Sequence, residues 1–122
     1  MILADTSIWV DHFRKRDDEL SRQLRGNNIS VHPFILAELA LGSLAGRVRT
    51  LSYLELLPPV RVAQTTEVRQ MIEARALFGG GIGFVDAHLI ASTLLTPHTV
   101  LWSRDKRLRA VTAALGIGSA LL

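Results

Sequence analysis

The chain has 122 residues, 48% of them hydrophobic, and a net charge of +3, which is the size and composition of one globular domain and excludes disordered and fibrous proteins. It contains no cysteine, so disulfides, thiol catalysis and thiolate metal sites are excluded, and any metal ion would have carboxylate or imidazole ligands. Because it shows neither a membrane-length apolar run nor the basic start of a signal peptide, we expect a cytoplasmic protein.

The first predicted element is a strand at residues 2–4, which stops at Asp5 before a second apolar stretch begins. In an open parallel sheet, ligands bind beyond the carboxyl ends of the strands, so Asp5 is placed for chemistry. Asp5, Thr6 and Ser7 are also residue types that commonly cap the start of a helix. Taken alone, this segment leaves both interpretations open.

Two short helices and a strand are predicted next. Residues 8–16 favour a helix that ends in the basic cluster 14–16, whose charges complement a helix C-terminus. Residues 17–25 favour a second helix, and a turn leads to a short strand at 29–32. The basic cluster is either a solvated helix end or part of a path for nucleic acid.

Pro33 stands at the start of the next predicted helix, where proline is favoured. Residues 34–41 are apolar all round except for Glu38, and a helix without a polar face is normally buried. A buried ionised carboxylate must be paired, protonated or bound to a cation, because its isolated burial is very costly. The alternative is that Glu38 points to solvent from a half-exposed helix.

The middle of the chain predicts two more helices and one strand. Residues 48–57 carry leucines at helical spacing, which we interpret as core or interface positions. After two prolines, residues 60–62 predict a short strand and residues 65–78 a helix with solvated charges. The glycine-rich run 79–83 lacks the Lys-Ser or Lys-Thr of a nucleotide P-loop, so we expect a flexible loop there.

A mostly apolar helix is predicted to begin at Phe84, with Asp86 as the lone acid near its start. This repeats the pattern of Glu38. His88, on the same helix, could be a ligand or a base, but a single helical histidine is more often structural.

Residues 99–102 predict the clearest strand after the first, and Asp105 follows its end. The carboxylate is flanked by the hydroxyl of Ser103 and by the cations of Arg104 and Lys106. A last helix and an apolar tail, which could add an edge strand, complete the chain.

Four acids therefore share one predicted location, the carboxyl edge of a parallel sheet. Carboxylates that converge repel one another, so that some protonate or a cation joins them. With oxygen ligands only, we expect Mg²⁺ or Mn²⁺, which can position a water for attack on a phosphodiester and stabilise the leaving oxygen. The four are Asp5, Glu38, Asp86 and Asp105.

The basic residues are almost all arginines, since only Lys15 and Lys106 of the fourteen are lysines. Arginine suits phosphate, which favours a polyanionic partner, although an arginine-rich codon usage would give the same bias. In such a protein the metal would reverse the charge of the acidic site while the outer basic residues hold the nucleic-acid backbone.

Four stretches in this order resemble the PIN-domain family, specifically the VapC ribonuclease toxins of bacterial VapBC toxin–antitoxin pairs. They are residues 4–9 (ADTSIW), Glu38 in its apolar helix, residues 84–87 (FVDA) and residues 101–106 (LWSRDK). The resemblance covers residues 1–122 as one domain. It implies an α/β/α sandwich with a mainly parallel five-stranded sheet and a Mg²⁺-dependent endoribonuclease. It also implies a homodimer that a VapB-like antitoxin neutralises by inserting a segment near the site.

The same resemblance assigns roles to the residues of these motifs. The four acids become the catalytic and metal-binding quartet, with Asp5 and Asp86 as direct ligands. Thr6 matches a hydroxyl that orients the first Asp or its water, and Ser103 keeps the hydroxyl of a frequent Thr.

Three further positions near the last motif are compared with the family pattern. Leu108 replaces a frequent aromatic residue, which concerns local packing more than chemistry. Arg104 and Lys106 are candidate contacts to RNA phosphates.

Two other functions are considered. In a phosphatase of the haloacid-dehalogenase type Asp5 would be a covalent nucleophile, but that class needs an acid two residues later, where this chain has Ser7. In a non-catalytic PIN-like module the basic surface or the apolar helices would bind RNA or a protein. The intact set of four acids argues against that module.

Overall fold

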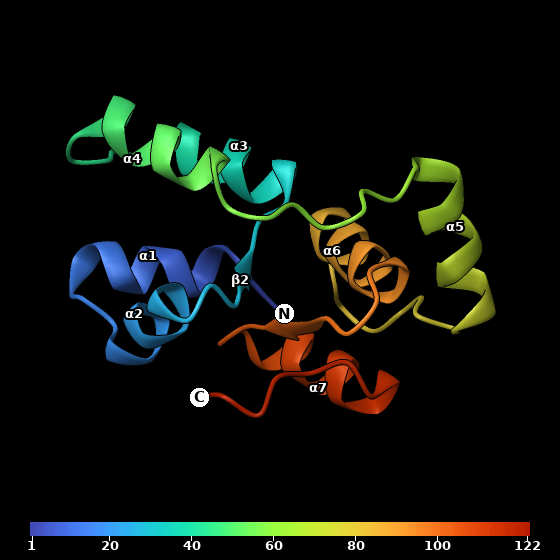
Figure 1. Ribbon diagram of the computed structural model, residues 1–122. Coiled ribbons are helices and arrows are strands. Elements are labelled where there is room, and N and C mark those ends of the chain that lie inside the picture. Colours follow the sequence, from blue (N-terminus) through green and yellow to red (C-terminus); the bar gives the residue numbers. More distant parts are fainter.

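The computed structural model describes residues 1–122 and contains a parallel sheet of three strands (Figure 1). β1 (Ile2–Ala4) is the central strand and lies between β2 (Ile29–Ser30) and β3 (Val100–Trp102). In register, Ile2 pairs with the first residue of each neighbouring strand. The carboxyl ends of all three strands therefore meet at one edge, where Asp5 follows β1.

Seven helices surround this sheet. They are α1 (Thr6–Arg14), α2 (Asp18–Arg25), α3 (Pro33–Leu41), α4 (Arg47–Glu55), α5 (Thr65–Ala74), α6 (Phe84–Leu95) and α7 (Lys106–Leu115). The side chains of Asp5, Asp17 and Asp105 cap α1, α2 and α7 by accepting backbone N–H bonds. α5 ends earlier than predicted, because Ala76 adopts a left-handed φ of 51°.

The helices form two groups, one at each end of the molecule (Figure 1). α3 and α4 form a hairpin beside α1 at one end, and α5 packs on α6 at the other. The core lies between them and includes Leu3, Ile8, Trp9, Ile90 and Trp102, all at most 1% exposed. α6 is buried over most of its length, as its apolar sequence predicted. No helix combines the length and the apolar character that crossing a membrane requires.

The prediction of a five-stranded sheet is wrong, because two of the expected strands are reduced to single parallel bridges. These bridges are Val31–Pro59 and Leu101–Gly118. In the segment predicted as a strand at residues 60–62, the N–H of Arg61 donates to Oγ1 of Thr96, and just after this segment the N–H of Ala63 donates to Oγ of Ser92. Side chains at the end of α6 thus take the donors that a strand ladder would use.

The apolar tail forms no edge strand for a similar reason. Ser119 donates its N–H to the carbonyl of Leu101, which makes one bridge. Its hydroxyl then accepts the N–H of Leu121, and this bond turns the chain away from the sheet. The expected fifth strand therefore ends after a single pairing.

The prediction that α3 is buried is also wrong. Ile35 and Leu39 are buried, but Leu41 is 89% exposed and Glu38 faces solvent. The helix packs mainly against α1 and α4, and its last residue, Leu41, is left uncovered. Leu56, which directly follows α4 at the other end of this hairpin, is also 84% exposed.

His32 joins α3 to α6 through a buried hydrogen-bond network. Its Nδ1 accepts the N–H of Phe34, 2.9 Å away, which caps α3. The proton must then lie on Nε2, which donates to Oγ of Ser92 at 3.1 Å. Burial, with a smaller effect of His88, lowers the pKa of His32 to about 4.

Acid should destabilise the protein through this histidine. The pKa of His32 lies below its ordinary value of 6.5, so between these values the unfolded chain takes up a proton that the folded chain does not. The contribution of neutral His32 to stability is thus fully present above pH 6.5 and is lost as pH falls toward 4. The free energy of unfolding should fall by roughly 2 kcal/mol between pH 7 and pH 5. Urea unfolding at both pH values measures it. His32→Asn, which retains a capping side chain, should show a smaller pH dependence, and an unchanged one would contradict the assignment.

Candidate active site

Asp5 is the most buried acid of the sheet edge, and it follows β1 and caps α1. Its side chain is 6% exposed and accepts the N–H of Ser7 at 3.0 Å and the Ser7 hydroxyl. Burial raises the pKa of Asp5, although hydrogen bonds from Ser7 and Ser103 oppose this rise. The same carboxylate caps α1 and lies at the carboxyl edge of the sheet. Capping by Asp5 therefore does not exclude a chemical role.

Asp86 lies in the first turn of α6 and is half-buried. Its pKa is raised first by burial, then by the charges of Asp5 and Asp105, with a smaller effect of Glu38. Asp5, Asp105 and Glu38 therefore all lie within electrostatic reach of Asp86.

Glu38 reaches the site from α3, and its exposure corrects the prediction that it is buried. The hydroxyl of Thr6 donates a hydrogen bond of 2.7 Å to Oε1 of Glu38. This bond fixes the carboxylate beside the N-terminus of α1, one residue after Asp5. Thr6 thus orients an acid 32 residues away in sequence.

Asp105 is exposed at the start of α7 and accepts the N–H of Leu108 at 3.0 Å. The hydroxyl of Ser103 accepts the N–H of Asp105 and also lowers the pKa of Asp5, so it links the loop after β3 to the loop after β1. Leu108, which stands where an aromatic residue is frequent, is fully buried in the core.

The two basic residues predicted to contact phosphate lie in different environments. Arg104 is engaged by Asp11 at 2.9 Å, by Asp17 and by the carbonyl of Leu122, so its guanidinium holds α1, α2 and the C-terminal segment together. Lys106 is exposed and makes no hydrogen bond or ion pair. Of the two, only Lys106 has a side chain free to bind an anion.

His88 has neither of its ring nitrogens hydrogen-bonded, and it is 3% exposed. Its ring packs against Phe34 and Phe84, with centroids 4.5 and 4.6 Å apart, and burial lowers its pKa. This packing agrees with the structural interpretation of His88.

No three acidic or histidine side chains are grouped so that together they could hold a metal ion. A hard cation such as Mg²⁺ does not require such a cage, because it usually keeps several waters and binds one or two carboxylates. The repulsion that raises the pKa of Asp86 is relieved by a cation. The oxygen donors of Asp5 and Asp86 therefore fit a hydrated hard cation.

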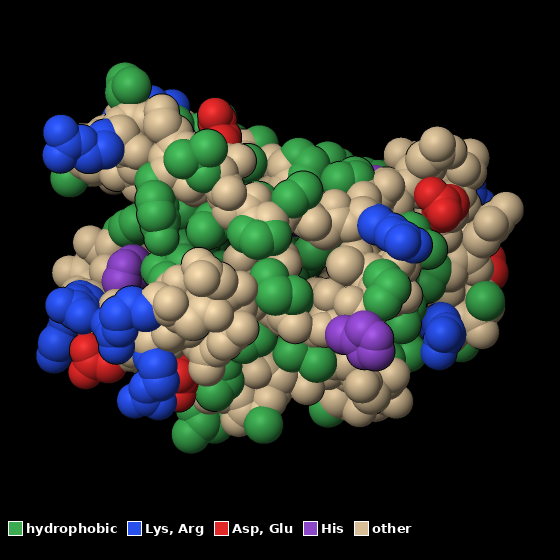
Figure 2. Space-filling model, in the orientation of Figure 1, with side chains coloured by type: hydrophobic (Ala, Val, Ile, Leu, Met, Phe, Trp, Pro, Cys, Tyr) green, Lys and Arg blue, Asp and Glu red, His purple; other side chains and the backbone are tan.

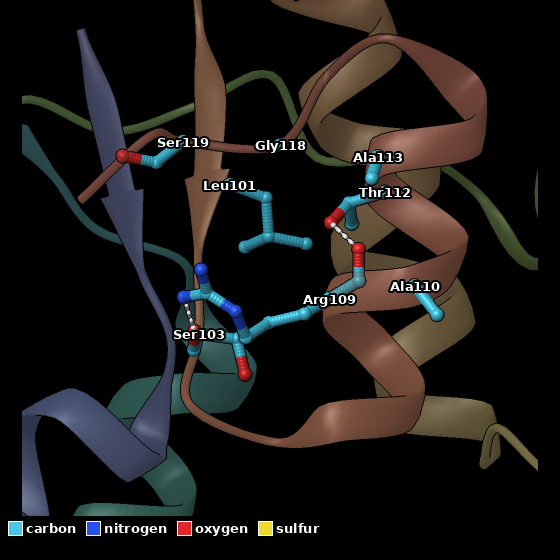
Figure 3. A pocket seen from close by; sticks show the side chains of 8 residues that line it. All are labelled: Leu101, Ser103, Arg109, Ala110, Thr112, Ala113, Gly118 and Ser119. Carbon is cyan, nitrogen blue, oxygen red and sulfur yellow. Dashed lines mark hydrogen bonds between the residues drawn. The ribbon is translucent and has the colours of Figure 1, made fainter. Parts of the chain in front are cut away.

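A cavity of about 310 Å³ lies away from the acids, between β3, α7 and the C-terminal segment (Figure 3). Figure 3 shows Arg109 pointing across it toward Ser103, whose carbonyl accepts a bond of 2.8 Å from Nη1. No carboxylate lines this cavity, and only Ser103 belongs to both places. Arg109, which lines this cavity, helps to hold Ser103 in place, but the lining contains no acid for catalysis.

The chain is also similar in sequence to a known family and to known proteins. A family model described as the PIN domain matches residues 2–114. Ribonuclease VapC32 of Mycobacterium tuberculosis, from the strains CDC 1551 / Oshkosh and ATCC 25618 / H37Rv, is 41% identical over 120 residues. The aligned region covers 98% of this chain and 97% of the relative.

Proposed function

Because this chain belongs to the PIN-domain family, we propose that it is a divalent-metal-dependent endoribonuclease that hydrolyses RNA phosphodiester bonds with water as the nucleophile. The observation that carries this proposal is the raised pKa of Asp86, which burial raises first and the nearby charges of Asp5, Asp105 and Glu38 raise further. The name of the relative, Ribonuclease VapC32, supports RNA as the substrate and a toxin of a type II toxin–antitoxin system as the class. Residues 1–122 then act as one PIN domain.

Asp5 and Asp86 are the direct ligands in this proposal, and Glu38 and Asp105 complete the acidic set. Mg²⁺, or Mn²⁺, when bound supplies the charge that activates a water and stabilises the leaving oxygen. The chain itself orients the acids. Ser7 and Ser103 hold the carboxylate of Asp5, and Thr6 holds that of Glu38.

The surface around the acids would bind the substrate. Lys106 follows Asp105 directly and has a free ammonium group, so it is the proposed phosphate contact at the site. Arg104 acts as a structural residue that holds the segments on which Asp5 and Asp105 lie.

A VapB-like antitoxin and a second copy of the chain are the proposed protein partners. The α3–α4 hairpin supports a protein contact, because Leu41, Val48 and Leu56 are each at least 80% exposed. A non-catalytic RNA- or protein-binding module is a second candidate, favoured by the absence of three acids grouped to hold a metal.

Calorimetric titration of the purified chain with Mg²⁺ and with Mn²⁺, followed by RNA cleavage in the same buffers, tests the proposal. We expect metal binding, cleavage that requires the metal, and loss of cleavage in EDTA. Cleavage that persists in EDTA would contradict the metal mechanism. Metal-independent RNA binding without any cleavage would establish the non-catalytic module.

Removing the hydroxyl of Thr6 should weaken catalysis without removing an acid. In Thr6→Val, the carboxylate of Glu38 loses its 2.7 Å hydrogen bond, and we expect cleavage to fall by about 10-fold, as for other groups that orient metal-site carboxylates. Thr6→Ser keeps the donor and should cleave at nearly the parent rate. Single-turnover cleavage at saturating Mg²⁺ measures both, and equal rates of all three proteins would contradict this role.

A further inference from the structure

A groove of about 280 Å³ separates α1 from α3 and begins at the acidic site. Its walls are mostly apolar, with Val10 on α1 facing Leu39 on α3. Glu38 lines one part of it, and Phe13 and Arg14 line another. Figure 2 shows hydrophobic side chains in the hollow between the α3–α4 hairpin and α1, with basic side chains toward the outer end of the molecule.

The groove is continuous with the proposed catalytic edge through Glu38. Thr6, which holds Glu38, lies on the same face of α1 as Val10 and Arg14, because these three residues follow one another at intervals of four. Arg14 is thus two turns, about 12 Å, along the helix from Thr6. A chain lying in the groove would pass from the acids to Arg14.

Phe13 offers an aromatic surface within this groove. Its side chain is 39% exposed, and its ring stacks on that of Trp9, with centroids 5.9 Å apart and an angle of 28° between the planes. Trp9 is 1% exposed and belongs to the core, so it holds Phe13 in place. A fixed and partly open ring is a suitable platform on which a nucleobase can stack.

Arg14 supplies the charge that a nucleic-acid backbone needs. It is exposed and forms neither an ion pair nor a side-chain hydrogen bond, in contrast to Arg104 and Arg22. No acid besides Glu38 lines the groove, and Glu38 is held by Thr6. The outer part of the groove is therefore apolar and cationic.

We propose that this groove binds a nucleotide of single-stranded RNA next to the bond that is cleaved, with its base on Phe13 and a backbone phosphate on Arg14. This inference rests on the proposed function and assigns two substrate-binding residues to it. RNA is the occupant that we argue for, because the groove combines a stacking surface and a cation with Glu38, one of the acids that would cut the strand.

The contribution of Phe13 is measured by fluorescence anisotropy with a short labelled oligoribonucleotide of mixed sequence in EDTA, where no cleavage occurs. Phe13→Ala should raise the Kd by about 10-fold, the usual effect of losing one base-stacking side chain. Phe13→Tyr keeps the ring and should bind like the parent. Phe78→Ala is the matched control, because Phe78 is 65% exposed and lies outside the groove.

The contribution of Arg14 is measured by the salt dependence of the same Kd. Loss of one phosphate contact in Arg14→Ala should lower the slope of log affinity against log salt by about 0.7, the value for single strands. Arg14→Lys keeps the charge and should keep the slope. Arg75→Ala removes an exposed arginine at the other end of the molecule and should leave the slope unchanged.

Equal Kd values for Phe13→Ala and Phe78→Ala would overturn the proposal. So would a parent chain that binds a labelled acidic peptide through Arg14 but binds no oligoribonucleotide. If the parent cleaves RNA with Mg²⁺ and Phe13→Ala binds and cleaves equally well, the groove assignment fails and the ribonuclease stands. If RNA binding depends on Phe13 but no metal supports cleavage, the groove assignment stands and the ribonuclease fails.

Discussion

Asp86→Asn is expected to reduce RNA cleavage roughly 1,000-fold or more, the scale on which enzymes lose rate when a preorganised charged group at the reacting centre is removed. Asparagine has nearly the same shape, so the α6 helix keeps its packing. The change removes a proposed metal ligand from a site where three other acids act on it. Calorimetric binding of Mg²⁺ and cleavage should disappear together.

Stability offers an independent measurement on the same variant. The pKa of Asp86 is raised by burial and by the other acids, so its ionised form is unfavourable in the folded chain at neutral pH. Asp86→Asn should therefore unfold at a higher temperature than the parent in EDTA. Glu73→Gln, at an exposed position on α5, is the control and should change neither property. A variant that cuts RNA like the parent would show that Asp86 is not catalytic.

Trp102→Ala is expected to lower the free energy of unfolding by about 3 to 5 kcal/mol, because it opens a large cavity in the core. Trp102 is fully buried and ends β3, directly before Ser103. Total stability of such domains is about 5 to 15 kcal/mol, so this single change removes a large share of it. Urea unfolding followed by circular dichroism measures the loss.

Trp102→Phe separates packing from polarity at this position. The indole N–H of Trp102 is buried and has no hydrogen-bond partner, so phenylalanine removes an unsatisfied donor while it fills most of the space. We expect its loss of stability to be well below that of the alanine variant. Equal losses would show that the cavity is not the cause.

Local sequence patterns correctly predicted the elements whose structure depends mainly on their own residues. The apolar run of residues 2–4, the apolar helix around Asp86 and the strand before Ser103 all formed where expected. The outer strands did not. In the predicted strand 60–62 the N–H of Arg61 goes to Thr96, and the N–H of Ala63 just after it goes to Ser92, both distant in sequence, whereas in the tail the N–H of Leu121 goes to the nearby Ser119. Nothing near residue 63 in the sequence indicates the bond to Ser92.

In the candidate site, too, some features follow from the local sequence and others depend on distant residues. Asp5 and Asp86 were predicted from strand ends and helix starts, and the structure places them in one electrostatic environment. The partners of Arg104 were not predicted, because its ion pair with Asp11 joins positions 93 residues apart. The exposure of Glu38 was also missed, since an apolar helix can leave one side uncovered when too few elements surround it.

The order of the strands has a consequence for the synthesis of this protein. β1 leaves the ribosome long before one of its two neighbours in the sheet, β3, has been made. The four acids are likewise spread from residue 5 to residue 105, so a nascent chain contains no complete acidic edge. A ribonuclease that needs all four acids could not cut the message from which it is being translated before Asp105 has been synthesised.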